Sequence, residues 1–174
     1  MQKRSRALVV VDMQVDFVSG GLGFEQAKPL PEKIASLIKE NIGLADLYFT
    51  LDTHEGDYLS TQEGKWLPIP HCIKGSAGHC LCEELEPFAK EGTLIEKPGF
   101  GSLELALALR ENGYSEVAFC GIDSSICVFS NAILAKAALP NAKICVLREY
   151  SLSSDLEAQE RAFAALKLVH IDVI

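Results

Sequence analysis

Short, continuous runs of apolar residues alternate along the chain with stretches that carry apolar residues at helical spacing. Residues 7–11 are apolar, largely β-branched and without alternation, which is typical of a parallel strand covered on both faces. Residues 31–42 then place apolar side chains at helical spacing, with a proline in the first turn and Gly43 directly after the last turn. The sequence therefore predicts a buried strand followed by an amphipathic helix.

The same alternation continues to the end of the chain. Further strands are predicted at 47–51, 93–96, 117–120, 144–147 and 169–173, with helices that begin near Ser102, Ser124 and Asp155. Strands that alternate with helices form parallel sheets through right-handed crossovers. We therefore predict an α/β fold: one three-layer α/β/α domain over residues 1–174, with a doubly wound, six-stranded parallel sheet. Ligands of such sheets bind beyond the carboxyl ends of the strands.

Composition and charge narrow the class of protein. The 174 residues are 48% hydrophobic and 23% charged, with a formal net charge of -8, which favours a compact chain and argues against binding to nucleic acid. No apolar stretch approaches the roughly 18 residues of a membrane span, and the run at 7–11 is too short for a signal peptide. We expect a cytoplasmic protein that binds neither nucleic acid nor membrane, with its six cysteines as free thiols.

Residues 53–92 form a connection far longer than the usual two to six residues or so between a strand and a helix, which predicts a functional excursion. Asp52 and His54 stand at its start, and residues two apart in extended backbone point to the same side. With His71 they offer three ligands, as in an open catalytic metal site. The alternatives are solvated histidines, or a structural zinc group without the paired C-x(2–4)-C spacing, formed by His71, Cys72, His79, Cys80 and Cys82.

Three reactive side chains are predicted at strand ends. Asp12 ends the first strand, Lys97 ends the third, and Cys127 stands early in the helix after the fourth. A helix N-terminus and a neighbouring lysine lower the pKa of a thiol, and an aspartate can move its proton. The alternatives are that Asp12 only anchors its loop and that the cysteine is a buried apolar residue, as we expect for Cys120 and Cys145.

Five motifs spread over nearly the whole chain support one interpretation. They are Asp-Met-Gln-Val-Asp-Phe at 12–17, Asp-Thr-His at 52–54, the segment 66–78, Lys-Pro-Gly-Phe-Gly-Ser at 97–102, and Gly-Ile-Asp-Ser-Ser-Ile-Cys-Val at 121–128. Together they resemble the nicotinamidases of the isochorismatase-like cysteine hydrolases. The resemblance implies a sheet of order 3-2-1-4-5-6. It also implies a catalytic triad and a divalent metal, zinc first with iron or manganese as alternatives, on these residues: Asp12, Lys97 and Cys127 for the triad, and Asp52, His54 and His71 for the metal.

The same resemblance implies how a substrate is held. In the family, a pyridine ring lies between aromatic side chains with its nitrogen toward the metal, and the residues that match are Phe17, Trp66 and Phe100. A cis peptide is implied at Ile122–Asp123. The backbone N–H groups of Asp123 and Cys127 would then form the oxyanion hole.

The expected activity is hydrolysis of a small amide, with nicotinamide as the expected substrate, a thioester on Cys127 as intermediate and a place in NAD salvage. Two alternatives stay open: a metal-free amidase for carbamoyl or ureido groups or another isochorismatase-like hydrolase, and a non-catalytic binding module on the same fold. The chain departs from the family at Ser124 and Ser125, usually Thr-Asp, and at Asp123, often a small neutral residue. The substrate is therefore less fixed than the mechanism. We also expect a homo-oligomer, since helix-covered sheets leave apolar surface free.

Overall fold

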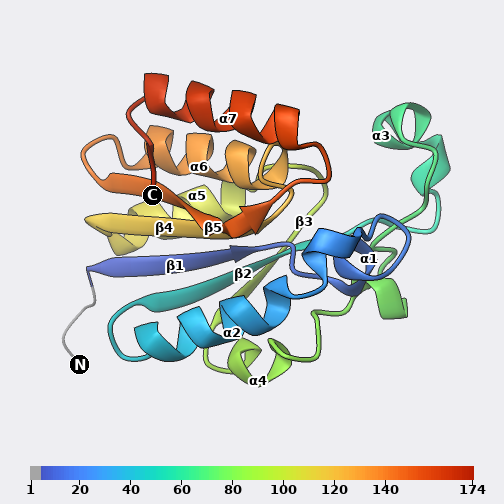
Figure 1. The fold of residues 1–174 in the computed structure, drawn as a ribbon, viewed down its shortest axis with the longest axis horizontal. Coiled ribbons are helices and arrows are strands. Elements are labelled where there is room, and N and C mark those ends of the chain that lie inside the picture. The colour runs from blue at the N-terminus through green and yellow to red at the C-terminus, as the bar shows by residue number, and fades with distance from the viewer. Residues whose placement is uncertain (1–4) are drawn as a thin grey trace.

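The computed structural model describes residues 5–174 as three layers around one six-stranded sheet (Figure 1). All strand pairs are parallel, in the order β3-β2-β1-β4-β5-β6. The fold class and strand order expected from the sequence are therefore confirmed. The strands are β1 (Arg6–Val11), β2 (Asp46–Asp52), β3 (Thr93–Lys97), β4 (Glu116–Ile122), β5 (Lys143–Leu152) and β6 (Asp172–Val173).

Helices cover both faces of the sheet (Figure 1). They are α1 (Val15–Val18), α2 (Leu30–Asn41), α3 (Gln62–Trp66), α4 (Glu86–Ala89), α5 (Leu103–Asn112), α6 (Cys127–Ala138) and α7 (Leu156–Leu168), with short 3-10 turns η1 (Glu25–Ala27), η2 (Tyr58–Ser60) and η3 (Ala77–His79). Helices α5, α6 and α7 pack on one face, and α2 and α4 on the other. No helix within residues 5–174 is long and apolar enough to cross a membrane.

The central strand β1 contributes to two hydrophobic clusters, one on each face of the sheet. Val9 and Val11 pack with the α5, α6 and α7 side, whereas Leu8 and Val10 pack with the α2 side. All four side chains are buried. This two-sided burial explains why the run at the start of the chain is apolar without alternation.

The last strand is shorter than the sequence predicted. Residues 169–173 were expected to form it, but β6 contains only Asp172–Val173. Helix α7 continues to Leu168, and the N–H of Ile171 then donates to the carbonyl oxygen of Leu166. The first residues of the expected strand therefore form the turn that ends the helix. Their backbone N–H groups donate to carbonyl oxygens of the last helical turn, which have no partner within the helix.

The carboxyl ends of β1, β2, β3 and β4 lie at the same edge of the sheet, because all strands run in parallel. The long excursion returns to this edge: His54 forms an isolated bridge with Ile73, and Gln14 forms one with Leu81. Figure 1 shows α3 projecting from the body on this side. The excursion therefore brings its own side chains to the edge where ligands of doubly wound sheets bind.

Candidate active site

Asp12 is the first residue after β1 and is fully buried. Its backbone has a φ of 50°, and its N–H donates to the carbonyl oxygen of Thr50 at 3.1 Å. The Thr50 hydroxyl donates to Asp12 Oδ1 at 2.6 Å. Burial raises the pKa of Asp12, and the nearby ammonium of Lys97 opposes this effect. Asp12 is therefore a stronger base than an exposed aspartate.

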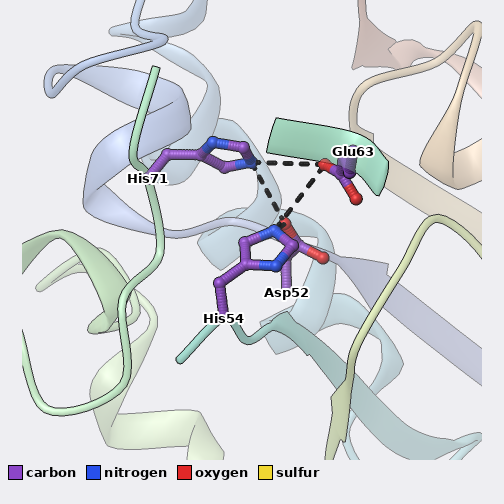
Figure 2. A group of neighbouring side chains, drawn as sticks. All are labelled: Asp52, His54, Glu63 and His71. Carbon is purple, nitrogen blue, oxygen red and sulfur yellow. Dashed lines mark hydrogen bonds and ion pairs between the residues drawn. The ribbon is translucent and has the colours of Figure 1, made fainter. Parts of the chain in front are cut away.

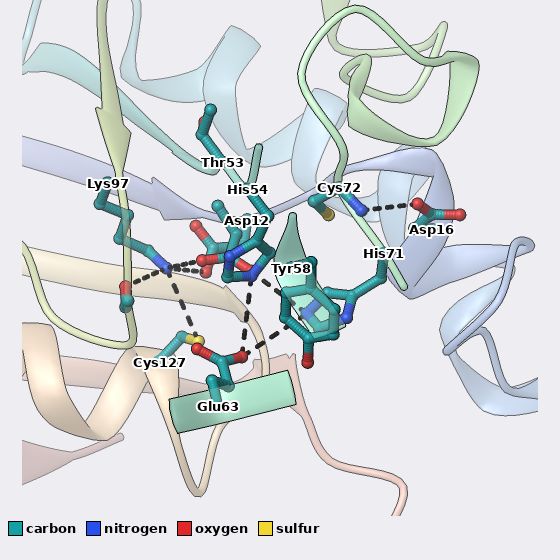
Figure 3. A network of polar contacts seen from close by, with 12 residues as sticks. Asp12, Asp16, Thr53, His54, Tyr58, Glu63, His71, Cys72, Lys97 and Cys127 are labelled. Carbon is teal, nitrogen blue, oxygen red and sulfur yellow. Dashed lines mark hydrogen bonds and ion pairs between the residues drawn. The ribbon is translucent and has the colours of Figure 1, made fainter. Parts of the chain in front are cut away.

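Lys97, the last residue of β3, is 1% exposed and joins the acidic groups of this edge (Figure 3). Its Nζ lies 2.7 Å from Asp12 Oδ2 and 3.1 Å from Asp52 Oδ1. It also donates to the carbonyl oxygen of Gly99 at 2.9 Å and to the Cys127 Sγ at 3.8 Å. Burial opposes the charge of Lys97, but the surrounding acidic groups raise its pKa above the usual value. The side chain is thus a fixed ammonium at the centre of the site.

Cys127 is the first residue of α6 and is 6% exposed. The sequence predicted that Lys97 lowers the thiol pKa, and Lys97 does act in that direction, but burial and the carboxylate of Asp12 outweigh it and raise the pKa of Cys127. The resting group is therefore a thiol that needs a base. Asp12 Oδ2 pairs with the ammonium of Lys97, and the Asp12 carboxylate also lies within hydrogen-bonding reach of the Cys127 thiol, so Asp12 can accept the thiol proton.

The backbone before Cys127 leaves two N–H donors open. The Ile122–Asp123 peptide is cis, as the resemblance implied. The carbonyl oxygen of Asp123 accepts from the N–H groups of Ile126 and Val128 at 3.2 and 2.9 Å, which closes the turn into α6. Among the backbone hydrogen bonds that residues 5–174 form outside helices and strands, none has the N–H of Asp123 or Cys127 as its donor. Open N–H groups at a helix N-terminus can hold a developing oxyanion.

A second group of side chains gathers beside this one, with its ligand atoms all within 4.8 Å of one another (Figure 2). His54 Nε2 lies 2.9 Å and His71 Nε2 lies 3.4 Å from Asp52 Oδ2. Both nitrogens lie 3.7 Å from Oε1 of Glu63, which comes from α3. The sequence predicted the first three residues and missed Glu63, because three acidic residues lie between the two histidines and no spacing distinguishes Glu63 from the other two.

Aromatic packing and one hydrogen bond fix the two imidazole rings. Tyr58 is 1% exposed, and the centroid of its ring lies 4.7 Å from the ring centroid of His54 and 5.0 Å from that of His71. Its hydroxyl donates to the carbonyl oxygen of Leu67 at 2.9 Å. The His71 Nδ1 is 2.8 Å from the carbonyl oxygen of Ile69, so Nδ1 carries the proton and Nε2 is left for a metal. No pattern in the sequence indicated Tyr58.

The loop after β1 orients the backbone of the metal group. The Gln14 amide donates to the carbonyl oxygens of Asp52 and His79, both at 2.9 Å, and accepts from the Asp52 N–H at 2.8 Å. Asp16 Oδ2 accepts from the N–H of Cys72, the residue after His71, at 2.7 Å. Burial opposes ionisation of Asp52, but hydrogen bonds from the histidines and the charge of Lys97 hold its pKa below the usual value. Asp52 is thus ionised, as a metal ligand must be.

The donor set fits a divalent transition metal. Two imidazole nitrogens and two carboxylate oxygens suit zinc, iron or manganese. The alternative zinc group is not assembled: His79 Nε2 bonds to the Thr53 hydroxyl at 2.8 Å, and Cys80 is exposed. Within residues 5–174, the six cysteines are free thiols.

Cys127 and residues of the metal group line one cavity of about 240 Å³. Phe17 and Phe100, two of the three aromatic residues expected around a substrate, line it together with Leu67, His71 and Cys127. Trp66 does not: its side chain is 82% exposed, and it is not among the residues that line the cavity. The reason is the direction of α3, which turns Glu63 toward the metal group and leaves its last residue outside.

Comparison with known proteins assigns the chain to a family. The family model described as the Isochorismatase domain matches residues 6–174. The chain belongs to the isochorismatase family. This family member is 31% identical over 142 residues to the uncharacterized isochorismatase family protein PncA of Bacillus subtilis, covering 74% of this chain and 76% of that protein. It is 29% identical over 144 residues to the nicotinamidase/pyrazinamidase of Mycobacterium tuberculosis, covering 73% and 76%.

A solved structure agrees with the family assignment. The pyrazinamidase of Pyrococcus horikoshii in complex with zinc is similar with a TM-score of 0.82 and 27% identity, over 98% of each chain. The resemblance to the nicotinamidase branch of the isochorismatase family is therefore confirmed by sequence and by structure.

Proposed function

We propose that the chain is a cysteine-dependent amidohydrolase that converts nicotinamide and water into nicotinate and ammonia. The observation that carries this proposal is the contact of Lys97 Nζ with Asp12 and Cys127, because Cys127 lines a cavity that residues of the metal group also line. The names of two similar proteins, a nicotinamidase/pyrazinamidase and a pyrazinamidase in complex with zinc, support a substrate that has an amide group on an aromatic ring. The buried metal group favours this function over that of a metal-free amidase.

The cavity offers a distinct place for each part of the substrate. Phe17 and Phe100 present aromatic faces to a flat heterocycle. A divalent metal, with zinc as the first candidate, would be held by Asp52, His54, Glu63 and His71 and would supply a Lewis acid that holds the ring nitrogen. The carboxamide then faces Cys127 on the other side of the cavity.

Acylation uses the triad and the two backbone donors. Asp12 accepts the thiol proton, and the sulfur of Cys127 attacks the carboxamide carbon. The N–H groups of Asp123 and Cys127 hold the oxyanion of the tetrahedral intermediate. Lys97 stabilises the thiolate as it forms. The intermediate collapses as Asp12 returns the proton to the leaving nitrogen, so ammonia departs and a thioester remains.

Deacylation repeats the same steps with water. Asp12 accepts a proton from a water molecule, whose oxygen attacks the thioester carbon. The same backbone N–H groups hold the second oxyanion. Its collapse breaks the carbon–sulfur bond, and Cys127 regains its proton from Asp12 as nicotinate is released. One water is consumed, and the triad ends as it began.

The experiment is an assay of ammonia release from nicotinamide by the purified protein, with and without chelator and added zinc. Cys127→Ala should abolish turnover while circular dichroism stays unchanged, because no other group in the cavity is a comparable nucleophile. Cys145→Ala is the matched control, since Cys145 lies buried in β5 away from the cavity. Turnover that survives in Cys127→Ala would refute the nucleophile, and full activity after complete metal removal would refute the metal's role.

A further inference from the structure

The carboxylate of Asp123, one of the three residues at which the chain departs from its family, is hydrogen-bonded to other residues of the protein. Its Oδ1 accepts from both the N–H and the hydroxyl of Ser125, each at 2.7 Å. Its Oδ2 accepts from the hydroxyl of Ser153 at 2.8 Å. A carboxylate with three short hydrogen bonds is held in one geometry, so it is not a free charge directed at a substrate.

These bonds join two loops that are far apart in the sequence. Ser153 follows β5, whereas Asp123 follows β4. The same two loops are tied again by Gln159 of α7, whose Oε1 accepts from the Ser124 hydroxyl at 2.9 Å and from the Ser153 N–H at 3.0 Å. Ser124, Ser153 and Gln159 are all buried. Helix α7 and the loop after β5 thus brace the turn that precedes Cys127.

The braced turn carries both proposed oxyanion donors. One donor is the N–H of Asp123 itself, and the other is the N–H of Cys127, the first residue of α6. The Asp123 carbonyl oxygen accepts from the N–H groups of Ile126 and Val128 and so holds the start of this helix. Asp123 also stands between two cavities, since it lines both the 240 Å³ cavity and an outer cavity of about 520 Å³. On the outer side the turn therefore has open space beside it, and the carboxylate bridge to Ser153 crosses that side.

We propose that Asp123 is a positioning residue, whose carboxylate bridge to Ser125 and Ser153 holds the two oxyanion donors in place. This inference rests on the proposed function, because the oxyanion forms during amide hydrolysis. Oxyanion donors act only when they lie about 2.7–3.1 Å from the developing charge. A misplacement of about 1 Å costs about 100-fold in rate.

The test compares two substitutions at Asp123. Asp123→Ala removes the bridge. Asp123→Asn keeps it: Oδ1 can still accept from Ser125, and Nδ2 can donate to the Ser153 hydroxyl, which then acts as acceptor. The asparagine removes the charge and preserves the geometry. The pair therefore separates a positioning role from an electrostatic one.

We expect Asp123→Ala to lower kcat for nicotinamide by about 10- to 100-fold with KM changed by less than about 3-fold, and Asp123→Asn to retain kcat within about 5-fold. The matched control is Asp155→Ala, which removes another carboxylate from the outer cavity, the N-cap of α7, and leaves the bridge intact. Its kcat should stay within about 2-fold, because the Asp155 carboxylate accepts from the N–H of Ala158 and takes no part in the bridge to Ser125 and Ser153.

A second readout does not depend on the activity. Hydrogen exchange of the backbone amides at 121–130, measured on peptides by mass spectrometry, should be faster in Asp123→Ala and unchanged in Asp123→Asn and Asp155→Ala. The positioning role is refuted if Asp123→Ala keeps kcat, if only KM changes, if the asparagine is as impaired as the alanine, or if exchange is unaltered. A wild-type protein without nicotinamidase activity would refute the proposed function, and the exchange data would still decide on the bridge.

Discussion

The hydrogen bond between Thr50 and Asp12 allows a quantitative prediction about Asp12, the proposed catalytic base. Both side chains are fully buried, and the hydroxyl donates to Oδ1 at 2.6 Å. Thr50→Val removes this donor with almost no change of shape. A hydrogen bond to a buried charged group is worth about 1.5–3 kcal/mol. At about 1.36 kcal/mol per pKa unit, its loss should raise the pKa of Asp12 by a further one to two units or so.

Two assays measure this change. The acid limb of the pH profile of kcat/KM for nicotinamide should move to higher pH by about one to two units, because Asp12 must be ionised to act as the base. The second assay measures the free energy of unfolding. The stability lost in Thr50→Val should be largest at high pH, whereas the activity lost should be largest at low pH. Burial already raises the pKa of Asp12 in the folded chain, so the folded state favours the protonated acid. The loss of about 1.5–3 kcal/mol in Thr50→Val is fully present above the folded-state pKa of Asp12 in the variant. It disappears as the pH falls below the folded-state pKa of Asp12 in the wild-type protein.

Thr50→Ser is the matched control, because serine keeps the hydroxyl and loses only a methyl group. It should keep the acid limb of the wild-type protein. If Thr50→Val and Thr50→Ser show the same acid limb, Asp12 is not the group that limits the rate at low pH. If the valine variant is equally destabilised at low and at high pH, the loss comes from packing and not from the carboxylate.

Three further predictions address the metal, the sheet and the far end of the fold. Glu63→Gln should weaken zinc binding by about 10-fold or more in competition with a chelator of known affinity, whereas Glu55→Gln should not. Gly121→Ala should lower the free energy of unfolding by about 3 kcal/mol or more, because Gly121 has a φ of +121° and a Cβ there would lie 2.1 Å from the carbonyl oxygen of Val11; a soluble variant of wild-type stability in urea titration would contradict this. Tyr114→Phe should cost about 1–2 kcal/mol in the same titration, because the hydroxyl donates to Asp46 at 2.8 Å, with unchanged kcat as its control.

The residues at the carboxyl edge of the sheet could be predicted from the sequence, because the relevant signals are local. Apolar runs mark the strands, and the residue that ends each run, such as Asp12 or Lys97, must lie at the carboxyl edge of a parallel sheet. The contact of Lys97 with Cys127 reaches across the ends of β2 and β1, which lie between β3 and β4 in the sheet. Within residues 5–174, the element bounds are less accurate where tertiary contacts set them, as at the turn that replaces the start of β6.

Other features depend on packing that no local pattern reports. Glu63 reaches the metal group only because the excursion folds back over the sheet edge, and the same folding leaves Trp66 outside the cavity. The pKa of Cys127 depends on how deeply the thiol is buried, which outweighs the neighbouring lysine. The bridge from Asp123 requires a partner 30 residues away in sequence, Ser153. None of these relations has a period or a spacing that predicts it.

The origin of Glu63 has a consequence for chain entropy. Three ligands of the metal group lie on the body or on the segment that returns to it, and the fourth lies on α3, which projects from the body (Figure 1). An ion shared by all four would cross-link the middle of a surface loop to both of its ends, much as a disulfide restricts a loop. Part of the binding free energy would then be used to order α3. Metal occupancy and protection of this segment from proteases should therefore rise and fall together.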